Sequence, residues 1–333
     1  MLKLLLALVC SFALGGCQRT SAENTTPRGT EPRQKITVAY TFQPQSTLVH
    51  IAVAKGYFSE EGLNVLPLMH TFGKAALQSV LENKADFATV AETPVMFNVL
   101  KGEKIFVLAN IEASSMNNAV VARKDAGIAV PADLKGKRIG FTPGTTTDFF
   151  LDSLLTANGL VRNDIQPVAV KPEDMQDAIA AKTVDAVSVW NYPLTQIKRQ
   201  LGTNAIVFYD REIYTETFNI ASKQEFVQKN PDTVKRFLRA LIKAEKFVMK
   251  NPADAQAIMA SSTKTDPDLI REVWNAFNYR VALDQILLIA LEDETRWAIK
   301  NKLTDQTIMP NYMSYIHLDS LREIKPEVVR MHR

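Results

Sequence analysis

The chain has 333 residues, 46% of them hydrophobic, and its 39 Lys and Arg against 36 Asp and Glu give a formal net charge of +3. A chain of this length and apolar content can build one large core or two moderate ones, and we expect two domains. Basic residues are interspersed with acidic ones, so the sequence lacks the basic stripe that nucleic-acid binding requires.

The first 17 residues have the pattern of a targeting segment. Lys3 precedes an apolar run from Leu4 to Leu14, which is too short for a permanent membrane-spanning helix. The run ends in two glycines and Cys17, which resembles the lipobox of bacterial lipoproteins. We therefore expect a signal peptide at 1–17, a lipid on Cys17 and a location in the periplasm or cell envelope. An ordinary secretory peptide is the alternative.

Residues 18–34 are rich in Ser, Thr, Pro and Arg and lack apolar periodicity, which indicates a flexible tether. Cys10 falls in the segment that would be removed and Cys17 would carry lipid, so the mature body has no thiol for catalysis, disulfides or metal. We expect no metal and no cofactor. No later apolar run reaches membrane-spanning length.

From residue 35 onward, short apolar runs alternate with helix-like segments. Strands are expected at 36–40, 65–68 and 86–90, and helices at 46–55, at 74–81 and from Glu92. Each helix after a strand begins near a hydroxyl residue, and Thr93 is a good cap before Pro94. This alternation implies a parallel sheet in an α/β domain, with ligands beyond the carboxyl ends of the strands.

The pattern restarts near Asn117, which indicates a second α/β unit. Strands are expected at 138–141, 166–170 and 185–190, with a helix at 175–181 and another that starts in a threonine cluster. A strand-like run at 217–221 follows, and from Pro231 the chain reads as helical almost to its end. The C-terminal third is expected to serve packing.

The threonine cluster follows Pro143-Gly144 and opens a helix through Thr145, Thr146 and Thr147. The first N–H groups of a helix lack intrahelical partners and carry the positive end of its dipole, so this turn can hold a small anion. Thr145 and Asp148 also fit a capping box that satisfies the helix alone. The local sequence is compatible with both roles.

Several motifs together resemble the type II periplasmic substrate-binding proteins of ABC importers, in the nitrate/sulfonate/taurine group that includes thiamine-precursor binders. The resemblance runs from about residue 35 to the end of the chain and rests on the segments 54–58, 61–63, 85–88, 92–94, 133–140, 144–147 and 184–193. It implies an α/β fold with two lobes joined by two crossovers and with ligand between them. We expect one lobe at 35–117 and 214–333, and the other at 118–213.

The resemblance also implies ligand-binding residues, which are Gln45, Ser46, Thr47, Glu92, Thr93, Thr145, Thr146, Thr147 and Trp190. Glu92 either accepts a bond from a ligand ammonium or orients the neighbouring loop, and Trp190 is either a pocket wall or core. Sulfonate and taurine binders often have an acidic residue where this chain has Asn117-Asn118, and Asp148 follows the threonines. These departures leave the ligand class open.

The expected function is that of an importer's solute-binding lipoprotein, a monomer that captures a small sulfonate-, taurine- or nitrate-like oxyanion and delivers it to a permease and ATPase complex. The alternatives are a thiamine-precursor-like pyrimidine or other amine as ligand, and a sensor or structural lipoprotein. We do not expect an enzyme, because His50, His70, His317 and His332 are isolated and no metalloprotease, nucleophile-elbow or P-loop motif is present.

Overall fold

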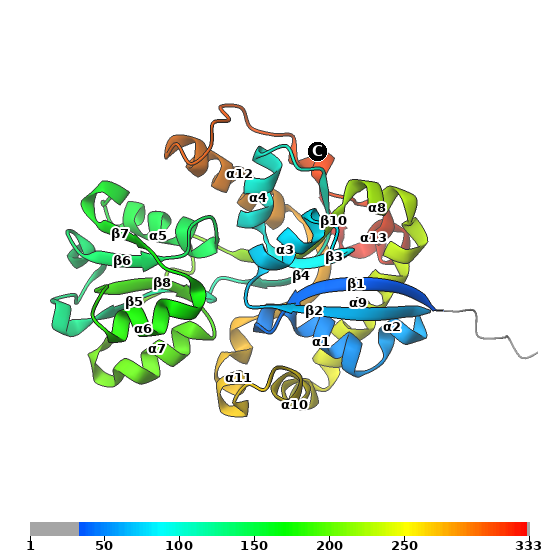
Figure 1. Ribbon diagram of the computed structural model, residues 1–333, viewed down its shortest axis with the longest axis horizontal. Helices are drawn as coiled ribbons and strands as arrows, with labels where there is room; N and C mark the ends of the chain where they lie inside the picture. The colour runs from blue at the N-terminus through cyan, green and yellow to red at the C-terminus, as the bar shows by residue number, and fades with distance from the viewer. Residues whose placement is uncertain (1–32, 332–333) are drawn as a thin grey trace, which may run out of the picture. The chain divides into compact units, whose positions relative to one another are not determined.

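Two β-sheets with surrounding helices organise the chain (Figure 1). The computed structural model describes residues 33–331, so Cys17, the expected signal peptide and most of the tether lie outside the described residues. We call the elements of the seven-stranded sheet the first lobe and those of the five-stranded sheet the second lobe. The fold is that of a two-lobed α/β periplasmic binding protein of type II, as expected.

The first lobe is built on a sheet with strand order β12-β11-β4-β10-β3-β1-β2. Its strands are β1 (Gln34–Thr41), β2 (Leu63–His70), β3 (Phe87–Ala91), β4 (Ile105–Ser114), β10 (Glu216–Lys223), β11 (Asn278–Asp284) and β12 (Val329–Arg330). Its helices are the 3-10 helix η1 (Pro44–Ser46), α1 (Thr47–Ala54), α2 (Tyr57–Glu60), α3 (Gly73–Leu81), α4 (Glu92–Leu100), α8 (Gln224–Lys229), α9 (Pro231–Lys250), α10 (Pro252–Thr263), α11 (Pro267–Val273), α12 (Gln285–Lys300) and α13 (Asp319–Ile324).

The second lobe is built on a sheet with strand order β7-β6-β8-β5-β9. Its strands are β5 (Asn118–Arg123), β6 (Arg138–Phe141), β7 (Gln166–Ala169), β8 (Ala186–Trp190) and β9 (Ala205–Phe208). Helix α5 (Thr146–Ala157) lies on one face of this sheet, and α6 (Met175–Ala180) and α7 (Pro193–Leu201) lie on the other (Figure 1). All five strands fall within the span expected for the second lobe, whose boundaries at 118 and 213 stay a prediction.

The expected parallel pairing is present between β1, β2 and β3 and between β6, β7 and β8, but each sheet also contains antiparallel strands. Strand β10 runs antiparallel to its neighbours β3 and β4, and β5 runs antiparallel to β8 and β9. The chain passes between the sheets from β4 to β5 and from β9 to β10 without a crossover helix. Consecutive strands joined by a crossover helix within one sheet run parallel. A strand that enters the sheet from the other lobe has no such connection and can run antiparallel.

Two local expectations also need correction. Helix α4 begins at Glu92 with Ala91 as its N-cap, so Thr93 lies inside the first turn and does not cap it. The C-terminal third contains strand β11 between β4 and β12, where we expected helix. The run 278–284 does alternate, with Tyr279, Val281 and Leu283 buried, but it lies between helical segments and forms a strand by pairing with β4, which is far away in sequence.

The core of the first lobe packs long-range aromatic pairs between sheet and helices. Phe87 on β3 stacks on Phe237 of α9 with a centroid distance of 4.1 Å, and Phe58 of α2 stacks on the same ring at 5.1 Å. Burying a side chain of this size contributes about 1.5 to 3 kcal/mol. Within residues 33–331, no helix combines the length and the apolar character that a membrane span needs.

Candidate functional site

A small cavity of about 30 Å³ lies between the two lobes. Its walls come from β1 and the loop after it, the start of α3, the β3–α4 junction, the start of α5, the end of β8 and strand β10. The lining residues are Thr41, Gln43, Gln45, Phe72, Gly73, Lys74, Ala91, Pro94, Thr145, Thr146, Trp190, Glu216 and Phe218. Most of these positions follow strand ends, where ligands of open α/β sheets bind.

Cross-lobe contacts surround this cavity. The backbone N–H of Tyr192 donates to Gln43 Oε1 at 3.2 Å, and Lys74 Nζ donates to the Pro143 carbonyl at 2.9 Å. Farther out, Trp297 Nε1 of α12 donates to Asp152 Oδ2 of α5 at 2.8 Å. These bonds hold the two lobes together around the cavity, which describes a closed arrangement.

Glu216, the first residue of β10, places a carboxylate in the cavity. Its Oε1 accepts hydrogen bonds from Gln45 Nε2 at 3.3 Å and Asn117 Nδ2 at 3.0 Å, and its Oε2 accepts from Asn117 Nδ2 at 3.0 Å and Asn118 Nδ2 at 2.5 Å. Burial raises the pKa of Glu216, and the three amides oppose that shift. In the described part of the chain the carboxylate is held by neutral donors without a Lys or Arg.

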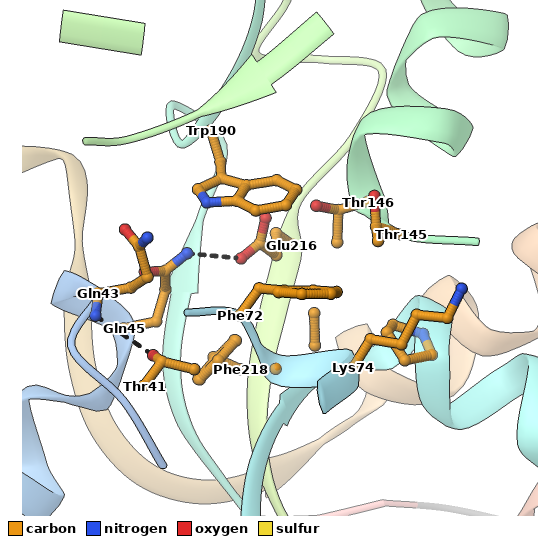
Figure 2. A pocket seen from close by; sticks show the side chains of 13 residues that line it. Thr41, Gln43, Gln45, Phe72, Lys74, Thr145, Thr146, Trp190, Glu216 and Phe218 are labelled. Carbon is orange, nitrogen blue, oxygen red and sulfur yellow. Dashed lines mark hydrogen bonds between the residues drawn. The ribbon is translucent and has the colours of Figure 1, made fainter. Parts of the chain in front are cut away.

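Aromatic rings flank this carboxylate. Figure 2 shows the Trp190 and Phe72 rings on opposite sides of Glu216, with Phe218 beyond Phe72. Trp190 is 7% exposed and lines the cavity, which favours a pocket wall over core for this residue. Flat aromatic faces stack on planar ligands, so the site combines an aromatic slot with a hydrogen-bond acceptor.

The threonine turn is divided between cavity and scaffold. Thr145 and Thr146 line the cavity, whereas Thr147 lines a separate small cavity on the second lobe. Thr145 Oγ1 donates to the Thr142 carbonyl at 2.7 Å, and Thr146 Oγ1 donates to Asn118 Oδ1 at 3.0 Å.

The expected capping box at this turn does not form. Thr145 is the N-cap of α5 but makes no side-chain cap bond, and Asp148 Oδ2 accepts from the Gly144 N–H at 2.9 Å, one residue earlier than a capping box requires. Asp148 also forms an ion pair with Arg162 at 2.6 Å. It is therefore committed to the second lobe and is not among the lining residues.

Three of the expected binding residues are not brought to the cavity. Ser46 Oγ bonds to Thr41 Oγ1 and Thr89 Oγ1, both at 2.9 Å, and Thr47 Oγ1 donates to the Pro44 carbonyl at 2.6 Å. The Thr93 hydroxyl donates to Glu294. The resemblance placed them near the ligand, but their hydroxyls stabilise the loop and helix behind the cavity wall.

Glu92 also lies behind the wall. Tyr214 donates to its Oε1, and the Thr217 N–H and hydroxyl donate to its Oε2 at 2.8 and 2.9 Å. Burial, and next the charge of Glu216, raises the pKa of Glu92 to about 8. Glu92 was expected either to accept a bond from a ligand ammonium or to orient a neighbouring loop. These contacts favour the second role, and the loop is the crossover segment between β9 and β10.

Glu92 and Glu216 belong to a group of four buried glutamates that also includes Glu112 and Glu294. Their exposed fractions are 0% for Glu92, Glu112 and Glu294 and 1% for Glu216. Burial raises the pKa of each one, and the charge of a neighbouring glutamate adds to the shift of Glu92, Glu112 and Glu294. The raised pKa values favour protonated, uncharged carboxyls, so this group brings less negative charge to the interior beside the cavity than four ionised glutamates would.

The cavity has one cation at its rim. Lys74 is exposed and reaches from the start of α3 to the second lobe, where the Gly144 backbone lies close to its ammonium group. Burial lowers the pKa of Lys74, and the charge of Lys101 adds to that shift. In Figure 2 it extends on the side of Thr145 and Thr146.

Sequence reasoning missed Phe72, Lys74 and Glu216. The pair Asn117-Asn118 was the available signal, because two adjacent amides at a crossover indicate a buried carboxylate partner somewhere in the fold. That partner, Glu216, lies 99 residues from Asn117 and 98 residues from Asn118, so the local sequence pattern could not identify it.

His50 is a core residue: it bonds to the Thr41 carbonyl at 2.9 Å, and burial lowers its pKa to about 4. Among residues 33–331, no group of three or more His, Cys, Asp or Glu is placed to hold a metal ion.

The sequence has named relatives among bacterial proteins. A protein of Brucella abortus (strain 2308), provisionally named a binding protein, is 29% identical over 230 residues, which cover 66% of this chain and 69% of the relative. A Bacillus subtilis (strain 168) protein, provisionally named an aliphatic sulfonates-binding protein, is 24% identical and covers 81% of each chain. The formylaminopyrimidine-binding protein of Halalkalibacterium halodurans is 23% identical and covers 81% of this chain and 82% of its own.

Solved structures share the fold. The alkanesulfonate-binding protein SsuA from Xanthomonas axonopodis pv. citri, bound to MOPS, matches with a TM-score of 0.74 at 16% identity over 86% of this chain and 99% of its own. The nitrate-binding protein NrtA from Synechocystis PCC 6803 matches with a TM-score of 0.70 at 15% identity over 89% of each chain. These are binding proteins, in agreement with the expectation that the chain is not an enzyme. The model of the family described as NMT1/THI5 like matches residues 43–255, and the chain belongs to this family.

Proposed function

We propose that the chain is the solute-binding protein of an ABC importer, which closes its two lobes on a small organic ligand and delivers it to a permease and ATPase complex. The two-lobed fold, the family and the cavity between the lobes support this role. Ligand-dependent closure of two lobes is a common device of such proteins. We also propose that it acts as a monomer.

The ligand class that best fits the cavity is a planar nitrogen heterocycle with N–H donors, such as an aminopyrimidine. The observation that carries this proposal is the amide-held carboxylate of Glu216 between the Trp190 and Phe72 rings (Figure 2). A ring in the slot stacks on both aromatic side chains, and its N–H groups take the place of the long bond from Gln45. A relative named for formylaminopyrimidine binding gives independent support.

A small oxyanion, such as a sulfonate, is the second candidate. Thr145 and Thr146 at the start of α5 and Lys74 at the rim also line the cavity, where a cation and a helix N-terminus favour negative charge. Relatives and solved structures named for sulfonate and nitrate binding support this class. The Glu216 carboxylate in the same cavity opposes it, so we rank it second.

Calorimetric titration separates the two candidates. We expect 4-aminopyrimidines to bind the wild type, and both Glu216→Gln and Trp190→Leu to weaken binding at least tenfold. Lys74→Met removes one exposed bond between the lobes and should weaken that affinity much less than either of these substitutions. Binding of ethanesulfonate that depends on Lys74 and not on Glu216 would reverse the ranking.

We also propose that the mature protein is anchored to a membrane by a lipid on Cys17, which places it in the periplasm or cell envelope. The apolar run that ends in two glycines and Cys17 supports this proposal. Intact-mass measurement of detergent-extracted protein should find a lipidated N-terminal Cys17. Cys17→Ser protein that stays lipidated would contradict it.

A further inference from the structure

Next to the ligand cavity, several deeply buried polar atoms lack hydrogen-bond partners among the described residues. They are Gln45 Oε1, both carboxyl oxygens of Glu112, and the hydroxyls of Tyr192 and Tyr279. The four residues are 3%, 0%, 4% and 8% exposed, respectively. Buried polar groups in folded proteins nearly always have a partner, so a concentration of unpartnered atoms marks a place where a bound group completes the structure.

Strand register places two of these residues side by side. Glu112 on β4 lies directly opposite Tyr279 on β11 and directly opposite Phe218 on β10. Residues opposite one another in adjacent strands project from the same face of a sheet. Because Phe218 lines the ligand cavity, Glu112 and Tyr279 lie on the cavity face of the sheet, in the row that leads away from Phe218.

The remaining two residues connect this row to the cavity. Gln45 lines the cavity, and its Nε2 donates a hydrogen bond to Glu216. The 3-10 helix η1, which contains Gln45, packs against β4. The Tyr192 backbone N–H donates to Gln43, another lining residue. Tyr192 and Glu112 are close enough to Tyr279 to raise its pKa electrostatically. The unpartnered atoms therefore belong to one polar cluster that borders the cavity at Gln45.

The chemistry of the cluster is uncharged. Burial, then the charges of Glu216 and Glu92, raises the pKa of Glu112 well above its usual range, which favours the protonated carboxyl, a form that can donate as well as accept. Burial also raises the pKa values of Tyr192 and Tyr279. The Thr47 hydroxyl lies near Tyr279 but its own hydrogen is used on the Pro44 carbonyl. The cluster offers O–H donors and oxygen acceptors together, with no ion to bind a charged group.

We propose that Gln45, Glu112, Tyr192 and Tyr279 form a subsite for an uncharged ligand substituent that both donates and accepts hydrogen bonds, namely a hydroxyl or an amide. The proposal rests on the proposed function, because it takes the adjoining cavity as the ligand site. Two groups of residues would then recognise two different parts of the ligand. Glu216 and the aromatic slot hold the ring or head group of the ligand, and the subsite selects among ligands by a polar side group.

The test compares two pairs of probes that differ by a hydroxyl group, 4-aminopyrimidine with its 5-hydroxymethyl derivative and ethanesulfonate with 2-hydroxyethanesulfonate. Calorimetry on the full mature chain should show that in the pair that binds, the hydroxylated member binds about fivefold to tenfold more tightly. Glu112→Leu and Tyr279→Phe should reduce this ratio to about one. Glu112→Gln keeps a donor and an acceptor at the position and should retain most of the ratio.

A matched control is Glu294→Gln. Glu294 is an equally buried glutamate with one unpartnered oxygen, but its other oxygen bonds to Thr93 and it is not part of the cluster. This substitution should leave the ratio unchanged. Equal affinities within the pair that binds, or a ratio that survives in folded Glu112→Leu, would overturn the subsite alone. Failure of all four probes to bind would overturn the proposed ligand classes and the subsite with them.

Discussion

Asn118 and Glu216 form a hydrogen bond that joins the two sheets: Asn118 Nδ2 on β5 donates to Glu216 Oε2 on β10 at 2.5 Å. The other end of the same amide, Asn118 Oδ1, accepts from the Thr146 hydroxyl at the start of α5. The carboxylate that faces the cavity is thus connected through one side chain to the helix of the opposite lobe. A ligand that bonds to Glu216 acts directly on the contact between the crossovers.

We expect Asn118→Asp to destabilise the closed form strongly at neutral pH. The substitution puts a second carboxylate against Glu216 in a buried site, where like charges and missing donors cost about 3 kcal/mol or more. The thermal midpoint should fall at pH 7.5 and recover partly at pH 5, where the pair shares a proton. Asn64→Asp, at an exposed position of β2, is the control and should have little effect. An unchanged midpoint for Asn118→Asp would contradict this contact.

Thr146 and Thr93 were both expected at the ligand, and the structure separates them. Thr146→Val keeps the shape of the side chain but removes the hydroxyl that supports Asn118 and Glu216, so ligand affinity should fall about fivefold to tenfold. Thr93→Val removes the partner of buried Glu294 and should lower the free energy of unfolding by about 1 to 3 kcal/mol. Titration and urea unfolding of both variants check this. A larger affinity loss in Thr93→Val would restore the original expectation.

The difference between these two threonines shows what the sequence could predict. Local patterns were sufficient for α1, α3, β1 and β3 and for the two-lobed family fold, because apolar periodicity and turn residues lie within short segments. The direction of β10 and the existence of β11 depend on pairing between distant strands.

The same limit applies to the site. Thr145, Thr146, Gln45 and Trp190 were expected to bind ligand, and each of them lines the cavity. The sequence analysis missed Glu216, because its place in the site depends on hydrogen bonds from Asn117 and Asn118, which are distant in sequence. Whether these residues bind ligand stays a prediction that the variants above test.

The free energy of unfolding should decrease as pH rises from about 6.5 to about 8; below pH 6.5 the lowered pKa of buried His50 acts in the opposite direction. The pKa of Glu92 is raised from 4.5 to about 8 in the folded state, so over this interval the folded protein holds a proton that the unfolded chain has released. One such group contributes at most about 1.4 kcal/mol per pH unit. Glu92→Gln should flatten the dependence, with the remaining slope due to Glu112, Glu216 and Glu294, whose pKa values are also raised.

Urea unfolding at pH 5, 6.5 and 8 measures this slope for the wild type and for Glu92→Gln. The variant should gain stability relative to the wild type at pH 8 and lose that advantage at pH 5. A wild-type stability that rises between pH 6.5 and pH 8, with the same slope in Glu92→Gln, would contradict a protonated Glu92 in the folded protein.

The bond between Trp297 and Asp152 should slow ligand release, because it links α12 of the first lobe to α5 of the second at 2.8 Å. Trp297→Phe keeps a ring against Phe149 but removes the N–H donor, and the dissociation rate measured by stopped flow should rise about fivefold. Tyr312→Phe removes a buried hydroxyl that bonds to Thr295 within the first lobe. That control should lower thermal stability without a change in the dissociation rate. A dissociation rate in Trp297→Phe equal to that of the wild type would show that the bond between Trp297 and Asp152 does not slow ligand release.

A crystal structure of the protein with the probe that binds most tightly tests the central claim most directly. The account predicts a ring between Trp190 and Phe72, with an N–H of the ligand within about 3 Å of a Glu216 carboxyl oxygen and the Gln45 bond replaced. A ligand bound outside this cavity, or one inside it that contacts Lys74 and Thr145 while Glu216 keeps only its amide partners, would contradict the account.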